Sequence, residues 1–161
     1  FPERPLPRGY NLIPFNPGLM PAFSAVSRMA FLRSPELEYY PSLATRKGCN
    51  EMVDELTDLD GFLPDASLLV RWHNEPVGII IARRLPASVF GEIKLVAVAP
   101  RHRRKGLARF LVNKTLDTFE ELGIPHAVLN INRSNRGPVR FFRIMGFQVN
   151  NSGTYGREIP H

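Results

Sequence analysis

Apolar residues recur at helical spacing in three stretches of this 161-residue chain, and each stretch predicts an amphipathic helix. The first covers residues 19–32 and ends at the Ser34-Pro35 pair. The second covers residues 47–59, and the third, with the clearest apolar stripe, covers residues 107–122. A fourth, shorter helix over residues 135–145 is predicted from its polar N-terminal cap and from the glycine that follows it.

Apolar runs between these helices predict strands. The first strand lies at residues 9–15, within a proline-rich arm that covers residues 1–21. A hairpin follows, with strands at 66–72 and 77–83 around a turn at 73–76. Further strands are predicted at residues 90–98, 127–131, 147–149 and 155–159. We therefore expect a single α/β domain that spans residues 1–161.

The composition is that of an ordinary globular protein, with 43% hydrophobic and 22% charged residues. A single cysteine, Cys49, excludes an intrachain disulfide and a zinc site built on cysteines, and we expect a cytoplasmic protein that needs no metal. No apolar run approaches the roughly 18 residues that cross a bilayer, so a membrane partner is not expected. Because the chain begins at Phe1 rather than methionine, its start is expected to be processed or truncated.

The strongest indication of function is a basic turn that joins the strand at 90–98 to the helix at 107–122. Backbone N–H groups at a helix N-terminus lack intrahelical partners and carry the positive end of the dipole, so this turn predicts an anion site. Gly106 would let a phosphate approach the backbone, and Arg103, Arg104 and Lys105 would add charge. The alternative is a solvated loop in which Gly106 is only a turn residue.

Three ordered motifs resemble those of the GNAT superfamily of N-acetyltransferases. They are Arg103-x-x-Gly106-x-Ala108, the strand Glu92-Ile93-Lys94-Leu95-Val96-Ala97-Val98, and the segment Asn135-x-x-Pro138-x-x-x-Phe142-x-x-x-Gly146-Phe147. The resemblance covers residues 66–150 well and the first 65 only by the order of elements. It implies a mixed, mostly antiparallel sheet flanked by helices, with a splayed central strand pair. It also implies an enzyme that transfers an acetyl group from acetyl-CoA to a primary amine.

The same resemblance implies roles for residues of the first two motifs. The turn, with Leu107 and Ala108 at the start of the helix, would bind the pyrophosphate of coenzyme A. Val96, Ala97 and Val98 would pair with the pantetheine arm as with an added strand. Glu92 falls where several family members keep a general base. Its alternative is a strand carboxylate that faces solvent or pairs with Lys94.

The third motif contributes Asn135 and Phe142 to the predicted cofactor site. In the family the asparagine binds the cofactor arm and a tyrosine hydroxyl faces the sulfur, but Phe142 has no proton to give. Alternatively, Asn135 is only the cap of the helix, and Phe142 is a packed core residue. Removing a proton from a lysine-like amine at pH 7 costs about 4.6 kcal/mol, against about 2 kcal/mol to protonate the leaving thiolate. Loss of the acid should therefore slow the transfer without abolishing it.

Other residues are weaker candidates for a nucleophile, a general base, a metal ligand or a contact with the amine. Cys49 lies outside every motif, so we expect the amine to attack the thioester directly. His102 and His126 are expected to point to solvent and His73 to lie in a turn, and no histidine has the spacing of a triad or a metal site. Four carboxylates of the second helix form either a solvated face or a field that attracts an amine: Glu51, Asp54, Glu55 and Asp58.

The net charge of +6 raises the question of nucleic acid as a partner. Binding through residues 101–105, Arg133 and Arg136 would need a basic recognition helix or aromatic stacking on a sheet face, and neither is evident. Nucleic acid is therefore not expected. A second alternative is a GNAT fold that binds acyl-CoA without catalysing transfer. The identity of the amine and the formation of a homodimer stay open.

Overall fold

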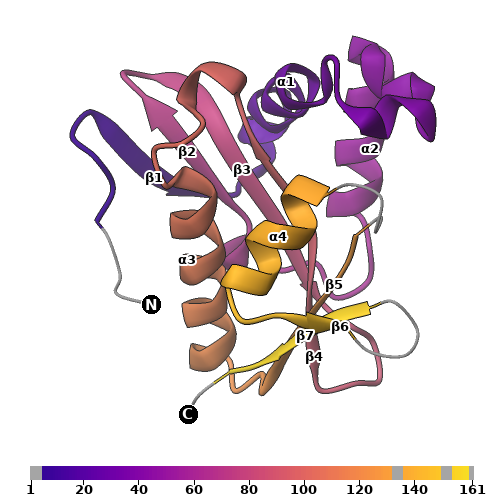
Figure 1. Ribbon diagram of the computed structural model, residues 1–161, viewed down its shortest axis with the longest axis vertical. Coiled ribbons are helices and arrows are strands. Elements are labelled where there is room, and N and C mark those ends of the chain that lie inside the picture. The colour runs from indigo at the N-terminus through magenta and orange to yellow at the C-terminus, as the bar shows by residue number, and fades with distance from the viewer. Residues whose placement is uncertain (1–4, 132–135, 150–153, 160–161) are drawn as a thin grey trace.

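The computed structural model describes residues 5–131, 136–149 and 154–159, whose elements form a seven-stranded sheet with helices on both faces (Figure 1). The strand order is β1-β2-β3-β4-β5-β7-β6. Strands β1 to β4 are antiparallel neighbours, β4 and β5 run parallel, and β7 is antiparallel to both β5 and β6. This is the mixed, mostly antiparallel sheet that the sequence implies.

The predicted helices and strands are confirmed with small shifts at their ends. The helices are α1 (Met20–Phe31), α2 (Arg46–Thr57), α3 (Leu107–Glu121) and α4 (Arg136–Ile144). The strands are β1 (Tyr10–Pro14), β2 (Leu68–Trp72), β3 (Glu75–Arg84), β4 (Phe90–Val98), β5 (His126–Asn130), β6 (Gln148–Val149) and β7 (Thr154–Glu158). The sequence pattern did not predict the short 3₁₀ helices, each of which starts at a proline whose fixed φ suits a first turn: η1 (Pro17–Leu19), η2 (Pro35–Glu38), η3 (Pro41–Ala44), η4 (Pro64–Ala66) and η5 (Pro100–His102).

The turn between β2 and β3 is shorter than the predicted turn at residues 73–76. His73 and Asn74 both have positive φ, 46° and 71°, as in the two-residue turns that match the twist of a hairpin. Glu75 and Pro76 already pair with β2. The prediction was therefore wrong for these two residues, because a proline is typical of turns but also fits the beginning of a strand.

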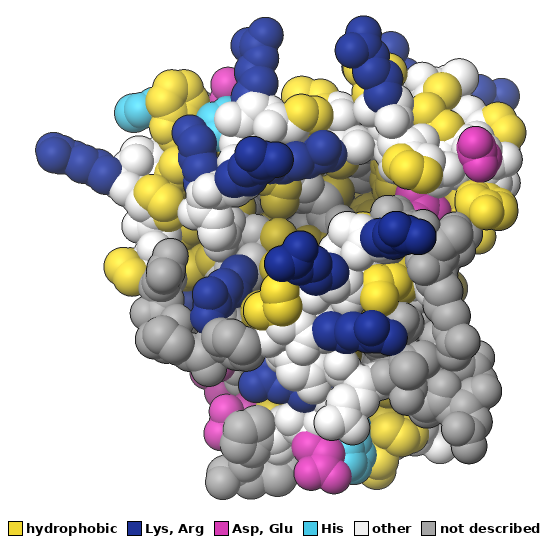
Figure 2. Space-filling view, in the orientation of Figure 1, with side chains coloured by type: hydrophobic (Ala, Val, Ile, Leu, Met, Phe, Trp, Pro, Cys, Tyr) yellow, Lys and Arg dark blue, Asp and Glu magenta, His cyan; other side chains and the backbone are white. Residues whose placement is uncertain are grey.

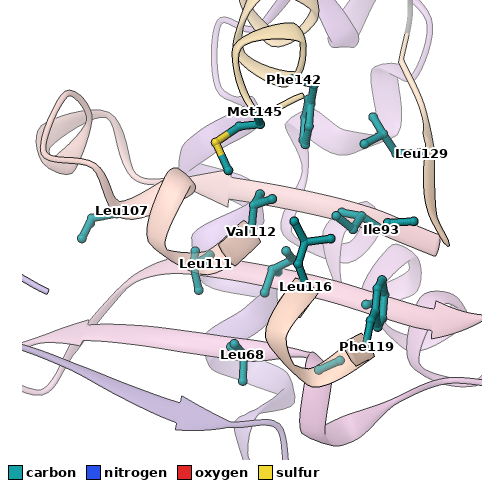
Figure 3. Packing of buried hydrophobic residues seen from close by; sticks show 14 of the residues in the cluster. Leu68, Ile93, Leu107, Leu111, Val112, Leu116, Phe119, Leu129, Phe142 and Met145 are labelled. Carbon is teal, nitrogen blue, oxygen red and sulfur yellow. The ribbon is translucent and has the colours of Figure 1, made fainter. Parts of the chain in front are cut away.

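Side chains of the central strands alternate between two hydrophobic layers. On one face, Leu69, Ile79 and Ile81 pack with Phe23 of α1 and Val53 of α2. The opposite face packs against α3 and α4, and Figure 3 shows buried members of this second layer: Leu68, Ile93, Leu111, Val112, Leu116, Phe119, Phe142 and Met145.

Strand β4 contains a β-bulge at Lys94. Ile93 pairs with Ala82 and Leu95 pairs with Ile81, so Lys94 is the extra residue between two regular pairs of β3 and β4. The bulge changes the alternation of side chains along β4. Ile93 packs on the α3 face, whereas Leu95, two residues further on, packs on the α1 face.

Strands β4 and β5 separate from each other along their length. Their parallel pairing joins residues 90–92 to residues 126–128 and ends at the pair Glu92 and Val128. Strand β4 nevertheless continues to Val98, while β5 stays paired with β7. The structure thus confirms the splayed central pair. Within the described residues, the edge of β4 from Ile93 to Val98 is not paired with β5.

Candidate active site

The basic turn lies between η5 and the first residue of α3. Gly106 precedes the helix with φ +80°, in the left-handed region that favours glycine. No side chain caps this helix end, and its first turn holds no acidic residue that would compete for an anion. A Cβ atom built on Gly106 would meet nothing within 4 Å. The turn therefore leaves open space beside the N–H groups at the start of α3, as an anion site requires.

Arg103 ties this turn to the rest of the molecule. Its Nε donates to the carbonyl oxygen of Val98 at 3.1 Å, and one terminal nitrogen donates to the carbonyl oxygen of Ala30 at 3.1 Å. These bonds join the turn to the end of β4 and to the last turn of α1, whose carbonyls lack helical partners. The guanidinium thus has a positioning role that the sequence did not reveal. Its contact with a phosphate stays a prediction.

Exposed basic side chains lie within the turn and on helix α4. Arg104 and Lys105 are exposed within it, and α4 exposes Arg136, Arg140 and Arg143. Figure 2 shows Lys and Arg side chains spread over the face that carries α3 and α4. Two separate segments therefore contribute positive charge to one side of the molecule, which favours a polyanionic ligand there.

The edge of β4 that is not paired with β5, as far as the described residues show, ends at this turn. In an antiparallel ladder, alternate residues direct their backbone N–H and C=O groups away from the partner strand. Some of these groups between Ile93 and Val98 therefore face the gap between β4 and β5. Val96 is half-buried, and Ala97 and Val98 are buried. An extended ligand in the gap would pair with this edge in the manner of an added strand.

Glu92 lies at the point where β4 and β5 separate. Its side chain is buried, and Oε1 accepts a hydrogen bond from Nε of Arg83 at 2.8 Å. Nζ of Lys94 lies 3.6 Å from the same oxygen. The sequence anticipated the contact with Lys94 as an alternative but missed Arg83. Arg83 faces Glu92 across the ladder between β3 and β4, a relation that only the strand register reveals.

Helix α4 brings Phe142 into the core beside the gap. The Phe142 side chain is 7% exposed, and its ring meets those of Phe141 and Phe147 edge to face, with centroids 4.9 Å and 5.4 Å apart. This packing fits the alternative of a core residue, and its role toward a cofactor stays a prediction. Asn135 lies outside the described residues, so its predicted contact with the cofactor arm also stays a prediction.

A family comparison agrees with this geometry. Residues 32–147 match a profile described as the acetyltransferase (GNAT) family. The chain belongs to the GNAT acetyltransferase family. The matched segment includes α2, the basic turn, the separated strands β4 and β5, and α4, so every residue predicted to bind the cofactor or to act as the base lies within it.

Curated relatives of this GNAT chain are mycothiol acetyltransferases. The chain is 30% identical over 151 residues to the enzyme of Pseudarthrobacter chlorophenolicus, covering 91% of this chain and 45% of that protein. It is 27% identical over 147 residues to the enzyme of Streptomyces coelicolor, with the same two coverages. The chain therefore spans about half the length of the curated relatives it matches.

Solved structures show the same fold at low sequence identity. PaiA N-acetyltransferase from Thermoplasma acidophilum, in complex with coenzyme A, matches with a TM-score of 0.70 and 14% identity, over 94% of this chain and 99% of that one. Ard1 from Thermoplasma volcanium matches with a TM-score of 0.72 and 18% identity, over 95% and 99% of the two chains. The GNAT architecture is thus shared along almost the full length of the domain.

His102 does not point to solvent as the sequence suggested. Its Nδ1 lies 2.7 Å from the hydroxyl of Tyr10, and its ring packs against Tyr10 and Trp72 with centroids 5.6 Å and 5.5 Å away. His126 is half-buried against Phe90, so it too is less exposed than expected. Both histidines are covered by aromatic residues from strands that are distant in sequence, which the local pattern does not reveal. His73 lies in a turn, as predicted, and is exposed there.

Cys49 is buried in α2, and its Sγ donates to the carbonyl oxygen of Leu43 at 3.2 Å. Burial raises the pKa of this thiol, an effect that the nearby Arg28 only partly offsets. The thiol is therefore mostly protonated at neutral pH and is a poor nucleophile.

We accordingly expect native protein at pH 7.5 to react with iodoacetamide at least about tenfold more slowly than the unfolded chain, because burial limits both access and thiolate. Mass spectrometry of the intact protein in buffer and in urea measures both rates. Equal rates would show that the thiol opens to solvent, and direct attack by the amine would lose this support.

Residues 5–131, 136–149 and 154–159 contain no group of three or more His, Cys, Asp or Glu side chains that could hold a metal ion. Among the same residues, no helix is long and apolar enough to cross a membrane.

Proposed function

We propose that this chain transfers an acetyl group from acetyl-CoA to a primary amine by direct attack of the amine on the thioester. The observation that carries the proposal is the end of the parallel pairing at Glu92 and Val128. From that point the edge of β4, which pairs with no residue of β5 in the described part of the chain, leads to the basic turn at the start of α3. One ligand with an extended arm and a pyrophosphate fits such a path.

Each part of coenzyme A has a candidate partner along this path. The pyrophosphate would lie at the N-terminus of α3, on the backbone of Gly106, Leu107 and Ala108, with Arg104 and Lys105 beside it. The pantetheine arm would pair with residues 96–98. The PaiA structure, which has the same fold and was solved with coenzyme A, supports the choice of coenzyme A as the ligand. Asn135 and Phe142 complete the proposed binding residues.

Glu92 is the proposed general base. As the amine nitrogen attacks the thioester carbon, Glu92 would take the proton from the amine, directly or through a water molecule. The carbon–sulfur bond then breaks, and the departing thiolate takes a proton. Arg83 and Lys94 both reach Oε1 of this carboxylate, so two cations hold it in place and compete with an incoming ammonium group.

Binding and turnover measured together test this function. Calorimetry with coenzyme A and a thiol-release assay with acetyl-CoA would be run against primary amines, polyamines, aminoglycosides and peptides with a free N-terminus. Binding together with turnover of at least one amine is expected. Binding without turnover across the panel would favour the alternative of an acyl-CoA-binding protein that catalyses no transfer. An absence of binding would refute the proposal.

The relatives suggest one acceptor to include in the panel. Because they are mycothiol acetyltransferases, an acceptor of the mycothiol type belongs in the panel. The chain covers less than half of those proteins, so their activity is no more than a starting point for the screen.

Phe142→Tyr distinguishes a cofactor-facing ring from a packed one. The ring is buried between Phe141 and Phe147, so we expect the new hydroxyl to lack a partner and to lower the free energy of unfolding by about 1–3 kcal/mol without raising the turnover number. Thermal melts and turnover measured on the same samples check this. A faster enzyme with an unchanged melting temperature would instead place the hydroxyl near the departing sulfur.

A further inference from the structure

Lys94 occupies an unusual place, because it is the extra residue of the bulge in β4. Its side chain is 26% exposed, and Nζ lies 3.6 Å from Oε1 of Glu92. Glu92 itself is the last residue of β4 that pairs with β5. The amine of Lys94 therefore lies beside the proposed base, at the point where the two strands begin to separate.

This position coincides with the end of the proposed cofactor path. An arm that runs along β4 from Val98 toward Ile93 delivers its acyl end close to the bulge. An acceptor amine must reach both that acyl group and Glu92, and Nζ of Lys94 already satisfies the second requirement. Within the described residues, Lys94 is thus an internal amine placed where a substrate amine is needed.

We propose that Lys94 is acetylated by the active site of its own chain, an inference that rests on the proposed function. Nζ gives one proton to Glu92 and attacks the thioester carbon. The new bond joins Nζ to the acetyl carbon, the carbon–sulfur bond breaks, and the thiolate takes up the second proton that Nζ loses. The products are Nε-acetyllysine and free coenzyme A, with one proton released to solvent.

Acetylation of Lys94 changes the charge at the point where β4 and β5 separate. Before it, Arg83 and Lys94 present two positive charges to the single carboxylate of Glu92. Afterwards Arg83 alone remains, because an amide carries no charge. Glu92 then has one fewer cation to compete with the ammonium group of an incoming acceptor.

The other lysines supply an internal control. The chain contains four lysines, at positions 47, 94, 105 and 114. The side chain of Lys47 is 88% exposed on α2 and that of Lys114 is 37% exposed on α3, whereas that of Lys94 is 26% exposed. Uncatalysed acetylation by acetyl-CoA follows exposure, so it would favour Lys47 over Lys94. A reaction in the active site reverses that order.

The experiment incubates unmodified protein with acetyl-CoA and follows all four lysines by peptide mass spectrometry. Lys94 is expected to react on the order of a hundredfold faster than Lys47, the gain that a positioned general base supplies. The rate per molecule should not change when the protein is diluted, because donor and lysine lie in one chain. Glu92→Gln should slow Lys94 and leave Lys47 unchanged.

Two outcomes separate this inference from the proposed function. If coenzyme A binds and a free amine is acetylated while Lys94 reacts no faster than Lys47, the inference alone is overturned. If coenzyme A does not bind at all, both the function and the inference fall. A Lys94→Arg variant, which keeps the positive charge beside Glu92, should lose the modified peptide while its other lysines react as before.

Discussion

Replacing Gly106 with valine is expected to weaken coenzyme A binding by at least about a hundredfold, which corresponds to about 2.7 kcal/mol. Nothing lies within 4 Å of the place where a Cβ atom would stand, so the valine side chain would fill the space that the proposed pyrophosphate needs. Calorimetry with coenzyme A on the folded variant measures the loss. Unchanged affinity would remove the basis of the proposed binding site.

Gly123→Val is the matched control for this variant. Gly123 follows the other end of α3, has φ +71°, and a Cβ atom built on it would likewise meet nothing within 4 Å. Both valines therefore carry a similar conformational strain of about 1–3 kcal/mol, but only the one at position 106 faces the anion site. Similar melting temperatures with different affinities are expected. Equal losses of affinity would mean that helix strain, rather than contact with the ligand, explains the first result.

Glu92→Gln is expected to lower turnover by about a hundredfold to ten-thousandfold while leaving coenzyme A affinity nearly unchanged. The amide keeps the shape of the side chain and an oxygen for Arg83, but it cannot take a proton from the amine. The loss should be largest below the pKa of the acceptor amine, where most of that amine is protonated. A pH–rate profile of wild type and variant checks this dependence.

Arg83→Gln tests whether the effect at Glu92 comes from the base or from the ion pair. Arg83 donates to Oε1 of Glu92, so its loss disturbs the same buried pair without removing the carboxylate. We expect lower stability and a much smaller loss of turnover than in Glu92→Gln. Equal losses of turnover in the two variants, or a wild-type pH profile in Glu92→Gln, would show that the proton goes to another group.

Patterns local in sequence predicted the elements that position the site. The apolar run at 90–98 and the stripe that starts at Leu107 gave β4 and α3 with close boundaries, because period and capping act within a few residues. The resemblance supplied the splayed strands, which local pattern alone does not encode. The bulge at Lys94 went unpredicted, because an extra residue in a strand has no signature of its own in the composition.

Contacts between distant segments explain what the sequence could not give. The sequence presents Arg103 only as a charge in a basic turn, whereas in the fold it donates to the carbonyl oxygen of Ala30, 73 residues away, at 3.1 Å. The sequence predicts a solvent-facing ring for His102, whereas in the fold Tyr10, 92 residues away, packs on it. The pairing of Arg83 with Glu92 depends on the register of a hairpin. In each case the partner is fixed by strand pairing or helix packing rather than by neighbours in sequence.

The bulge in β4 absorbs one residue without changing which face of the sheet the candidate base occupies. Strand β4 pairs with β3 on both sides of Lys94, out to the pair of Val98 with Gly78 on one side and the pair of Gly91 with Arg84 on the other. Deleting Lys94 would place Ile93 next to Leu95, just as their partners Ala82 and Ile81 are neighbours in β3, so regular alternation would return and Glu92 would stay opposite Arg83. The extra residue is thus one that the strand could lose while the carboxylate kept its side of the sheet.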